Sequence, residues 1–142
     1  MKLHTYLSFN GNCAQAFATY AELLGGKVLA LMAFGESPMS EQCGAGARDL
    51  IMHGCMEIAG HQLMGTDATP EHPYQPLVGQ HLVADVDSVA EAERVFDALA
   101  AGGRVDMPLA ETLWAKRYGM LVDRFGVPWM INHSEPQPGQ CA

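Results

Sequence analysis

Residues 4–28 read HTYLSFNGNCAQAFATYAELLGGKV, and residues 81–105 read HLVADVDSVAEAERVFDALAAGGRV. Both stretches contain the same features in the same order: an apolar strand, a turn, an amphipathic helix, two glycines and a second strand. At a constant offset of 77 positions the marker residues coincide without a gap: His4 with His81, Gly25-Gly26 with Gly102-Gly103, Lys27 with Arg104, and Val28 with Val105. The sequence therefore predicts an internal duplication.

The first repeat contains a helix whose ends and buried face are marked in the sequence. Asn12 is placed to cap the N-terminus, with Gln15 as its partner three residues later. Gly25 is placed to end the helix, because glycine adopts the left-handed conformation without a Cβ clash. Apolar residues at helical spacing predict one buried stripe, made of Ala16, Phe17, Tyr20, Leu23 and Leu24.

The second repeat has the same plan with different residues. Ser88 and Glu91 form an S-x-x-E capping box, in which each side chain bonds the other residue's backbone N–H. Gly102-Gly103 is expected to end this helix as Gly25-Gly26 ends the first. Its predicted buried stripe consists of Ala92, Val95, Phe96 and Leu99.

Further strands are predicted after each helix, so that the chain becomes two tandem βαβββ modules of the α+β class. The expected strands include residues 28–34, 50–58, 61–64, 104–107, 118–122 and 127–132. We expect a single domain, 1–142, built from module one at 3–65, a proline-rich linker at 66–80, module two at 81–133 and a flexible tail at 134–142.

Composition and charge exclude several classes of function. The 142 residues carry 8 Lys+Arg against 16 Asp+Glu, a net charge of −8, and no basic run. A nucleic-acid or anionic-membrane partner is therefore not expected. No apolar stretch is long enough to span a bilayer, and the N-terminus lacks the pattern of a signal peptide. The four cysteines have no C-x-x-C spacing and are interpreted as reduced thiols of a cytoplasmic protein.

Four short motifs carry a resemblance to a known family: FNGN at 9–12, LLGGKV at 23–28, IMHG at 51–54 and DRFGVPWMIN at 123–132. Together with the paired βαβββ modules, they resemble the PhnB-like branch of the vicinal oxygen chelate superfamily. That superfamily includes glyoxalase I, extradiol dioxygenases and bleomycin- and fosfomycin-resistance proteins. The resemblance covers residues 3 to about 132.

The resemblance implies a glyoxalase-like architecture and a homodimer. In the superfamily, the paired modules form a half-barrel cleft with the helices outside, and chains commonly pair or exchange modules. The cleft would take a small-molecule ligand. The sequence leaves open whether that cleft is formed within one chain or between two.

The resemblance also implies a metal hypothesis. Metal-binding members place one ligand on the first strand and one on a later strand of each module. His4 and His81 match the first-strand positions, and His53 matches the later one. Adding the repeat offset to position 53 leads to Met130, where metal-dependent members usually carry a carboxylate. Three imidazoles with an open position would suit Zn²⁺, Ni²⁺, Mn²⁺ or Fe²⁺, whereas a thioether is a poor ligand for hard divalent ions.

Strand alternation predicts which other side chains would face the cleft. Tyr6 lies on the face opposite Leu7 and Phe9, and Cys55 and Glu57 follow His53 at alternate positions. Asp85 shares a face with His81, and a carboxylate in an apolar cleft is a candidate general base. The alternative interpretation is that Asp85 and Glu57 are solvated near strand ends.

Aromatic and sulfur-containing residues complete the candidate cleft. Met130 is expected to face the cleft, because Trp129 beside it should face the helix. The family places Trp114 and Tyr118 at the cleft rim, where their rings would stack on a flat ligand, although packing within the loop is an equal alternative.

Three hypotheses for function follow. The first is a glyoxalase-like isomerase or lyase that uses a metal in the cleft. The second is a metal-free protein that binds or sequesters an organic ligand, in the manner of bleomycin-resistance proteins. The third is an enzyme that works without a metal and uses Asp85 as the base. The sequence does not decide whether the protein is an enzyme, because a superfamily fold hosts many functions.

Overall fold

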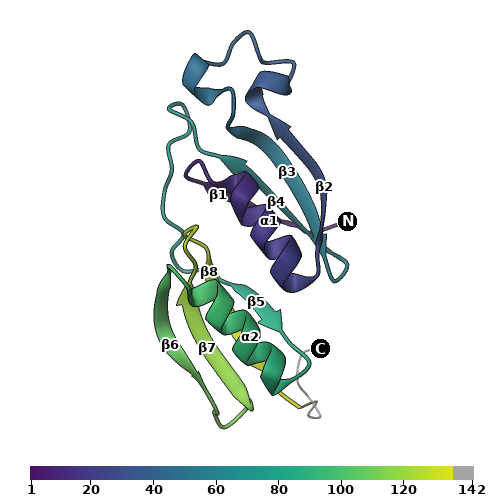
Figure 1. Ribbon diagram of the computed structural model, residues 1–142, viewed down its shortest axis with the longest axis vertical. Helices are drawn as coiled ribbons and strands as arrows, with labels where there is room; N and C mark the ends of the chain where they lie inside the picture. Colours follow the sequence, from purple (N-terminus) through teal and green to yellow (C-terminus); the bar gives the residue numbers. More distant parts are fainter. Residues whose placement is uncertain (136–142) are drawn as a thin grey trace. The chain divides into compact units, whose positions relative to one another are not determined.

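The computed structural model describes residues 1–135, so most of the tail expected at 134–142 lies outside the described residues. The chain divides into two compact units. Unit 1 comprises Met1–Pro76 and unit 2 begins at Leu77. Each unit has the order βαβββ, so the predicted duplication and the α+β class are confirmed (Figure 1).

Unit 1 is one helix against one four-stranded sheet. The strand order is β1-β4-β3-β2, with β1 parallel to β4 and the other pairs antiparallel. A long connection with two short 3-10 helices, η1 (Phe34–Glu36) and η2 (Ala45–Ala47), joins β2 to β3. The regular elements are β1 (Thr5–Phe9), α1 (Cys13–Leu24), β2 (Lys27–Ala33), β3 (Ile51–Ile58) and β4 (His61–Asp67).

Unit 2 repeats this topology. Its strand order is β5-β8-β7-β6, with β5 parallel to β8 and the remaining pairs antiparallel. The connection between β6 and β7 is short. The elements are β5 (Leu82–Asp85), α2 (Val89–Ala100), β6 (Arg104–Ala110), β7 (Arg117–Val122) and β8 (Pro128–His133).

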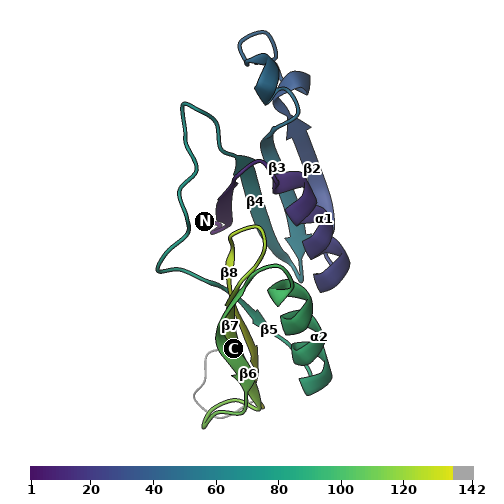
Figure 2. The same cartoon turned by 60° about the vertical axis from the view of Figure 1, so that its left-hand side comes forward.

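In each unit the helix covers one face of its own sheet (Figures 1 and 2). In unit 1 the buried face has the predicted alternation, because Leu7 and Phe9 are buried whereas Tyr6 is half exposed. The buried residues of α1 are Cys13, Ala16, Phe17 and Tyr20. In unit 2 the whole predicted stripe of α2 is buried: Ala92, Val95, Phe96 and Leu99. Within residues 1–135, the opposite face of each sheet is not covered by the helix of its own unit, and we call it the helix-free face.

Two glycines let the helices approach their sheets. A Cβ at Gly54 on β3 would lie 2.9 Å from the Phe17 ring, and one at Gly119 on β7 would lie 2.7 Å from the Phe96 ring. Such distances are shorter than van der Waals contact, so any larger residue would push the helix away. These glycines also show which face of β3 and β7 the helices cover.

The two helices are capped differently. At α2 one bond of the predicted capping box is confirmed, because Ser88 Oγ accepts from Glu91 N at 3.1 Å. The Glu91 carboxylate accepts from Asp87 N at 3.0 Å and not from Ser88 N, the donor that a capping box uses. At α1 Asn12 occupies the N-cap position as predicted, but its side chain makes no capping bond. Asp67, at the end of β4, accepts from Cys13 N at 2.9 Å instead and takes the place of a local cap.

The helix ends follow the glycine prediction in part. Gly25 is the C-cap of α1 with φ of 68°, in the left-handed region that glycine adopts without strain. The C-cap of α2 is Ala101 in an extended conformation, and the left-handed residue is Gly102, one position later.

The constant offset of 77 positions holds only through the second strand of each unit. Val28 pairs with Met56, and Val105 pairs with Leu121, so Met56 corresponds to Leu121 at an offset of 65. On β4 and β8 the offset is 66, because the partners of Met56 and Leu121 are Leu63 and Trp129. The cause is the long connection after β2, which has a much shorter counterpart in unit 2.

Several boundaries differ from expectation. β4 extends to Asp67, so the connection between the units begins later than residue 66. His4 and His81 each lie one residue before their strand. Pro108 lies within the edge strand β6, where the pairing with β7 is irregular. Proline has no N–H to donate, so within a sheet it is tolerated at such positions. No helix in residues 1–135 is long and apolar enough to cross a membrane.

The buried thiol of Cys13 is expected to make stability depend on alkaline pH. Burial, with a smaller contribution from the charge of Asp67, raises its pKa from 9.0 to about 12. Between these values the unfolded chain releases a proton that the folded chain keeps, so the free energy of unfolding should fall as pH rises above 9. Denaturant unfolding of wild type and Cys13→Ala from pH 8 to 11 measures this. The wild-type curve should fall more steeply, and parallel curves would contradict the assignment.

Candidate functional site

The helix-free face of unit 1 carries a row of side chains across the middle of the sheet. Pairing aligns Tyr6 with Met64, Met64 with Cys55, and Cys55 with Ala30. We call this the middle row of unit 1. Its neighbours along the strands, such as Leu63, point to the helix and are buried. The predicted cleft residues Tyr6 and Cys55 therefore lie on one face together with Met64.

Tyr6 and His53 form the main polar contact on this face. The Tyr6 hydroxyl and His53 Nδ1 share a hydrogen bond of 3.2 Å, and the two rings are stacked with centroids 5.8 Å apart. Desolvation, and next the charge of Cys13, raises the pKa of the Tyr6 phenol, while a hydrogen bond with Thr66 opposes the shift. Whichever tautomer His53 adopts, its Nε2 has no hydrogen-bond partner in the described part of the chain.

The strand pairing does not bring His4 and His53 together. Extending the β1–β4 pairing places His4 level with Gln62, whereas His53 lies level with Thr66 and two strands away. With a rise of about 3.3 Å per residue and strands about 4.8 Å apart, their Cα atoms would be roughly 16 Å apart. Two imidazoles and one metal ion with bonds of about 2.1 Å do not span that distance.

The register also corrects the assignment of Met130 as the counterpart of His53. In β7, Tyr118 corresponds to His53. Tyr118 pairs with Asn132 in the same way that His53 lies opposite Thr66. Met130 on β8 corresponds to Met64 on β4, because both pair with the middle of the first strand of their unit. The offset prediction was wrong because it ignored the difference in loop length.

Unit 2 has a middle row of its own. Val83 pairs with Met130, Met130 with Met120, and Met120 with Met107. Val83 is 58% exposed and Met107 is 43% exposed, so this apolar, thioether-rich row is open over much of its length. Met130 faces away from the helix as expected, since Trp129 beside it is buried.

Next to this row lies a polar row made of Asp85, Asn132 and Tyr118. Asn132 Nδ2 donates to Asp85 Oδ1 at 2.7 Å. The Trp114 ring meets the Tyr118 ring edge-on, with centroids 5.6 Å apart, and Trp114 is 52% exposed. Asp85 and Tyr118 therefore flank Asn132 on one face, and Trp114 contacts Tyr118. Asp85 is exposed, as the solvated alternative expected.

The remaining predicted residues are less closely tied to these clusters. Glu57 is exposed and pairs with Lys27 near the end of β3. His4 is exposed, and His81 is half-buried just before β5. Within residues 1–135, no three His, Cys, Asp or Glu side chains form a group that could hold a metal ion. The spacing of His4 and His53 within unit 1 argues against the predicted set of His4, His53 and His81 as ligands of one ion.

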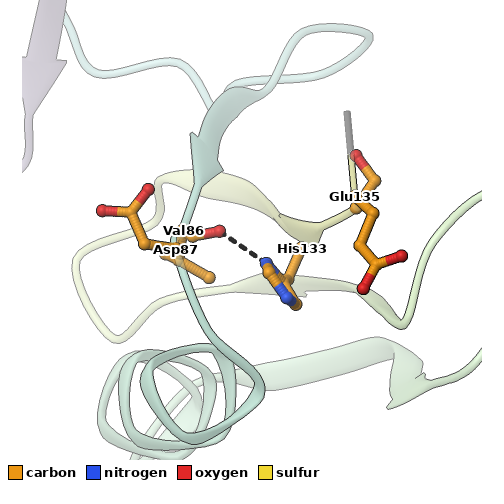
Figure 3. A pocket seen from close by; sticks show the side chains of 5 residues that line it. Val86, Asp87, His133 and Glu135 are labelled. Carbon is orange, nitrogen blue, oxygen red and sulfur yellow. Dashed lines mark hydrogen bonds between the residues drawn. The ribbon is translucent and has the colours of Figure 1, made fainter. Parts of the chain in front are cut away.

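A hollow lies beyond the end of β5 and β8 and contains none of the predicted residues (Figure 3). Val86, Asp87, His133, Ser134 and Glu135 line it. His133 Nδ1 lies 2.8 Å from the Val86 carbonyl oxygen, which ties the ring to the backbone. In Figure 3 Asp87 and Glu135 lie on opposite sides of this ring, and the Asp87 carboxylate points away from it. The Glu135 carboxylate pairs with Lys116.

Sequence reasoning missed four residues of the helix-free faces: Met64, Thr66, Met120 and Asn132. Thr66 was missed because the expected strand ended at residue 64, whereas β4 runs to Asp67. The others follow from alternation once a neighbour is assigned, since Asn132 is two positions from Met130. The alternation was present in the sequence, but the strand pairing was needed to show which of these residues share a face.

The sequence matches the family model of the Glyoxalase/Bleomycin resistance protein/Dioxygenase superfamily over residues 2–131. The chain belongs to this superfamily. Protein YjdN of Escherichia coli K12 is 43% identical over 148 residues, covering 99% of this chain and 100% of that protein.

Solved structures have the same fold. Protein PA1353 of Pseudomonas aeruginosa has a TM-score of 0.87 and 45% identity, over 96% of this chain and 99% of that one. A PhnB protein from Bacillus cereus has a TM-score of 0.79 at 24% identity, over 94% and 100% of the two chains, so the PhnB-like fold is confirmed. The fosfomycin resistance protein FosX of Listeria monocytogenes, complexed with Mn(II) and a dihydroxypropylphosphonic acid, has a TM-score of 0.64 at 11% identity, over 93% and 90%.

Proposed function

We propose that this member of the glyoxalase superfamily binds a small organic molecule on its helix-free sheet faces, and that no divalent metal anchors the ligand. The middle rows carry the proposal: corresponding positions in the two units hold methionine, thiol, aromatic or aliphatic groups that are open to solvent over much of their length. Apolar surface with a few placed polar groups is typical of sites for organic ligands.

The donor set argues against a hard divalent ion. The register makes Tyr118 the counterpart of His53, so the corresponding position in unit 2 holds a phenol and not an imidazole or a carboxylate. His53 itself is engaged by the Tyr6 hydroxyl. The residues present therefore do not fit a divalent site of the usual imidazole–carboxylate kind, and we derive no reaction step through such a group.

A metal-dependent isomerase or lyase is the second candidate, with His53 as the ligand in unit 1; His4 is left out because its spacing from His53 exceeds the reach of one ion. One observation favours it: Tyr6 engages Nδ1 of His53 and leaves Nε2 available, an arrangement that is common around metal-bound histidines. The FosX relative was solved with Mn(II), although at 11% identity it is informative about the fold alone.

Metal analysis separates the two candidates. Protein purified without a histidine tag or chelator, and then dialysed against Zn²⁺, Ni²⁺, Mn²⁺ or Fe²⁺, is expected to retain less than one ion per chain by elemental analysis. The matched variants are His53→Ala and, as a control in the connection between strands, His72→Ala. Stoichiometric metal that is lost in His53→Ala and kept in His72→Ala would overturn the metal-free proposal and favour the enzyme.

Ligand binding is tested directly. A thermal-shift screen of small neutral and charged aromatic compounds should find stabilising ligands, because anything that binds only the folded state raises its melting temperature. Met130→Ser, which removes thioether surface from a half-exposed position, should weaken those ligands. Met39→Ser, at an exposed methionine in the β2–β3 connection, is the control. A screen without any stabilising aromatic compound would contradict the proposal.

We further propose a homodimer in a reducing, cytoplasmic compartment. The cysteines of the described residues, Cys13, Cys43 and Cys55, are free thiols, as expected for such a compartment. The exposed apolar side chains include Leu29, Leu31 and Val105 on the edge strands β2 and β6. Sedimentation equilibrium tests the dimer, and a monomer at high protein concentration would exclude it.

A further inference from the structure

We propose that the helix-free face of unit 2 selects a planar organic cation, held between the Asp85 carboxylate and the Trp114–Tyr118 ring pair. This inference rests on the proposed ligand-binding function and names the chemical class of the ligand. Such a ligand has a flat ring and a positively charged amine, amidine or guanidine group.

The negative end of this site is a carboxylate that the protein holds in place but does not neutralise. Asn132 Nδ2 donates to Asp85 Oδ1 at 2.7 Å, so the carboxylate is oriented from the neighbouring strand. No Lys, Arg or His forms an ion pair with Asp85 among residues 1–135. The side chain is exposed, so a cationic ligand can reach its second oxygen.

Basic residues in the same unit are engaged elsewhere. Arg104 pairs with Asp106 at 2.7 Å, Lys116 pairs with Glu135, and Arg117 pairs with Glu93 at 3.6 Å. These cations are therefore not placed to neutralise Asp85. The chain as a whole has a net charge of −8, which favours the approach of a cation over that of an anion.

The other end of the site is an aromatic surface presented by a fixed turn. The Thr112 hydroxyl accepts from Ala115 N at 3.1 Å, and Thr112 N donates to Ala115 O at 2.9 Å. This turn, anchored by the buried Ala115, leaves Trp114 half exposed against Tyr118. An indole face that is held in this way can stack on a flat ring and attract a cation through its π-electrons.

The spacing between the two ends suits one aromatic ring with a charged substituent. Asp85 and Tyr118 both pair with Asn132, from opposite sides, so they are two strands apart, or about 10 Å between backbones. The thioethers of Met120 and Met130 lie in the adjacent row and provide soft apolar surface beside the ring.

Unit 1 lacks these features at the corresponding positions. Ser8 and Thr66 replace Asp85 and Asn132, and the Thr66 hydroxyl donates to the Met52 carbonyl oxygen at 2.8 Å. His53 replaces Tyr118 and is engaged by Tyr6. The carboxylate and the exposed indole are thus specific to unit 2, so the two helix-free faces are not equivalent in charge.

Matched probes test the inference. Benzamidine and benzamide have nearly the same shape, but only benzamidine is a cation at neutral pH. The chain has two tryptophans, and Trp129 is 3% exposed, so quenching on titration reports mainly on Trp114. Benzamidine should bind roughly fivefold more tightly than benzamide at low salt, as expected for an ion pair near a protein surface. Isothermal titration calorimetry gives the same ratio independently.

The variants make the outcome specific. Asp85→Asn keeps the shape and should reduce the ratio to about one, whereas Asp87→Asn, an equal charge change two residues away, should keep it. Trp114→Ala should weaken both probes. Equal binding of the two probes, or a preference that survives Asp85→Asn, would overturn the cation inference and leave the ligand-binding function standing. If neither probe binds while the thermal-shift screen finds other aromatic ligands, the inference also fails, but the proposed function does not.

Discussion

Replacing Asp123 with alanine is expected to lower the free energy of unfolding by about 4 kcal/mol, because three buried donors lose their acceptor at once. Asp123 Oδ1 accepts from Phe125 N at 2.9 Å and from Val127 N at 3.0 Å, and Oδ2 accepts from Trp129 Nε1 at 2.9 Å. Asp123 is 4% exposed, so water does not replace these bonds in the variant. The turn between β7 and β8 would lose its internal support.

Urea denaturation followed by circular dichroism measures this change. Asp123→Asn should have a smaller effect, since the amide oxygen still accepts from the two backbone donors while its NH₂ group opposes the Trp129 N–H. Asp87→Ala removes an exposed carboxylate from the same unit and should change stability by less than about 0.5 kcal/mol. A loss below about 1 kcal/mol in Asp123→Ala would show that the three bonds contribute little.

The same turn illustrates what the sequence could predict. Residues 123–126 separate the strands predicted at 118–122 and 127–132, Asp and Gly are common in turns, and the structure has a turn there. The sequence did not predict that the Asp123 carboxylate also fixes the Trp129 indole. That bond depends on the alignment of β7 with β8, which a local pattern does not specify.

Most features that depend on neighbouring residues were predicted correctly, although Leu23 and Leu24 of the predicted α1 stripe are only half-buried. The helix stripes follow from a period of 3.6 residues, and the buried residues of α2 match the prediction at every position. The bond from Glu91 N to the Ser88 hydroxyl is predicted from four consecutive residues and is confirmed at 3.1 Å. The burial of Leu7 and Phe9 follows from a period of two.

Features that depend on loop length and pairing were not predictable from the repeat alone. The offset changes from 77 to 65 positions after the second strand, so Tyr118 takes the position that was assigned to Met130. Of the predicted candidates, Tyr6, Cys55, Asp85 and Met130 lie on helix-free faces, because alternation is local. The contact of Tyr6 with His53 required the pairing of three strands.

The second large effect is expected at Asp67, the buried carboxylate of unit 1. Asp67→Ala should lower the free energy of unfolding by about 3 kcal/mol, because two buried backbone donors lose a charged acceptor. Asp67 Oδ1 accepts from Cys13 N at 2.9 Å and Oδ2 from Ile51 N at 2.8 Å, so the side chain joins β4 to the start of α1 and to β3. Its negative charge also lies at the positive end of the α1 dipole.

Two controls distinguish this long-range cap from the local one that the sequence indicates. The Asn12 side chain makes no capping bond and its buried Oδ1 has no partner within residues 1–135, so Asn12→Ala should cost less than about 0.5 kcal/mol, whereas a true N-cap would cost about 1 kcal/mol. Ser88→Ala, at the confirmed cap of α2, should cost about 1 kcal/mol. Urea denaturation of all three variants gives the order Asp67→Ala, Ser88→Ala, Asn12→Ala. If Asn12→Ala were as damaging as Ser88→Ala, the helix would be capped locally after all, and the role of Asp67 would reduce to its bond with Ile51.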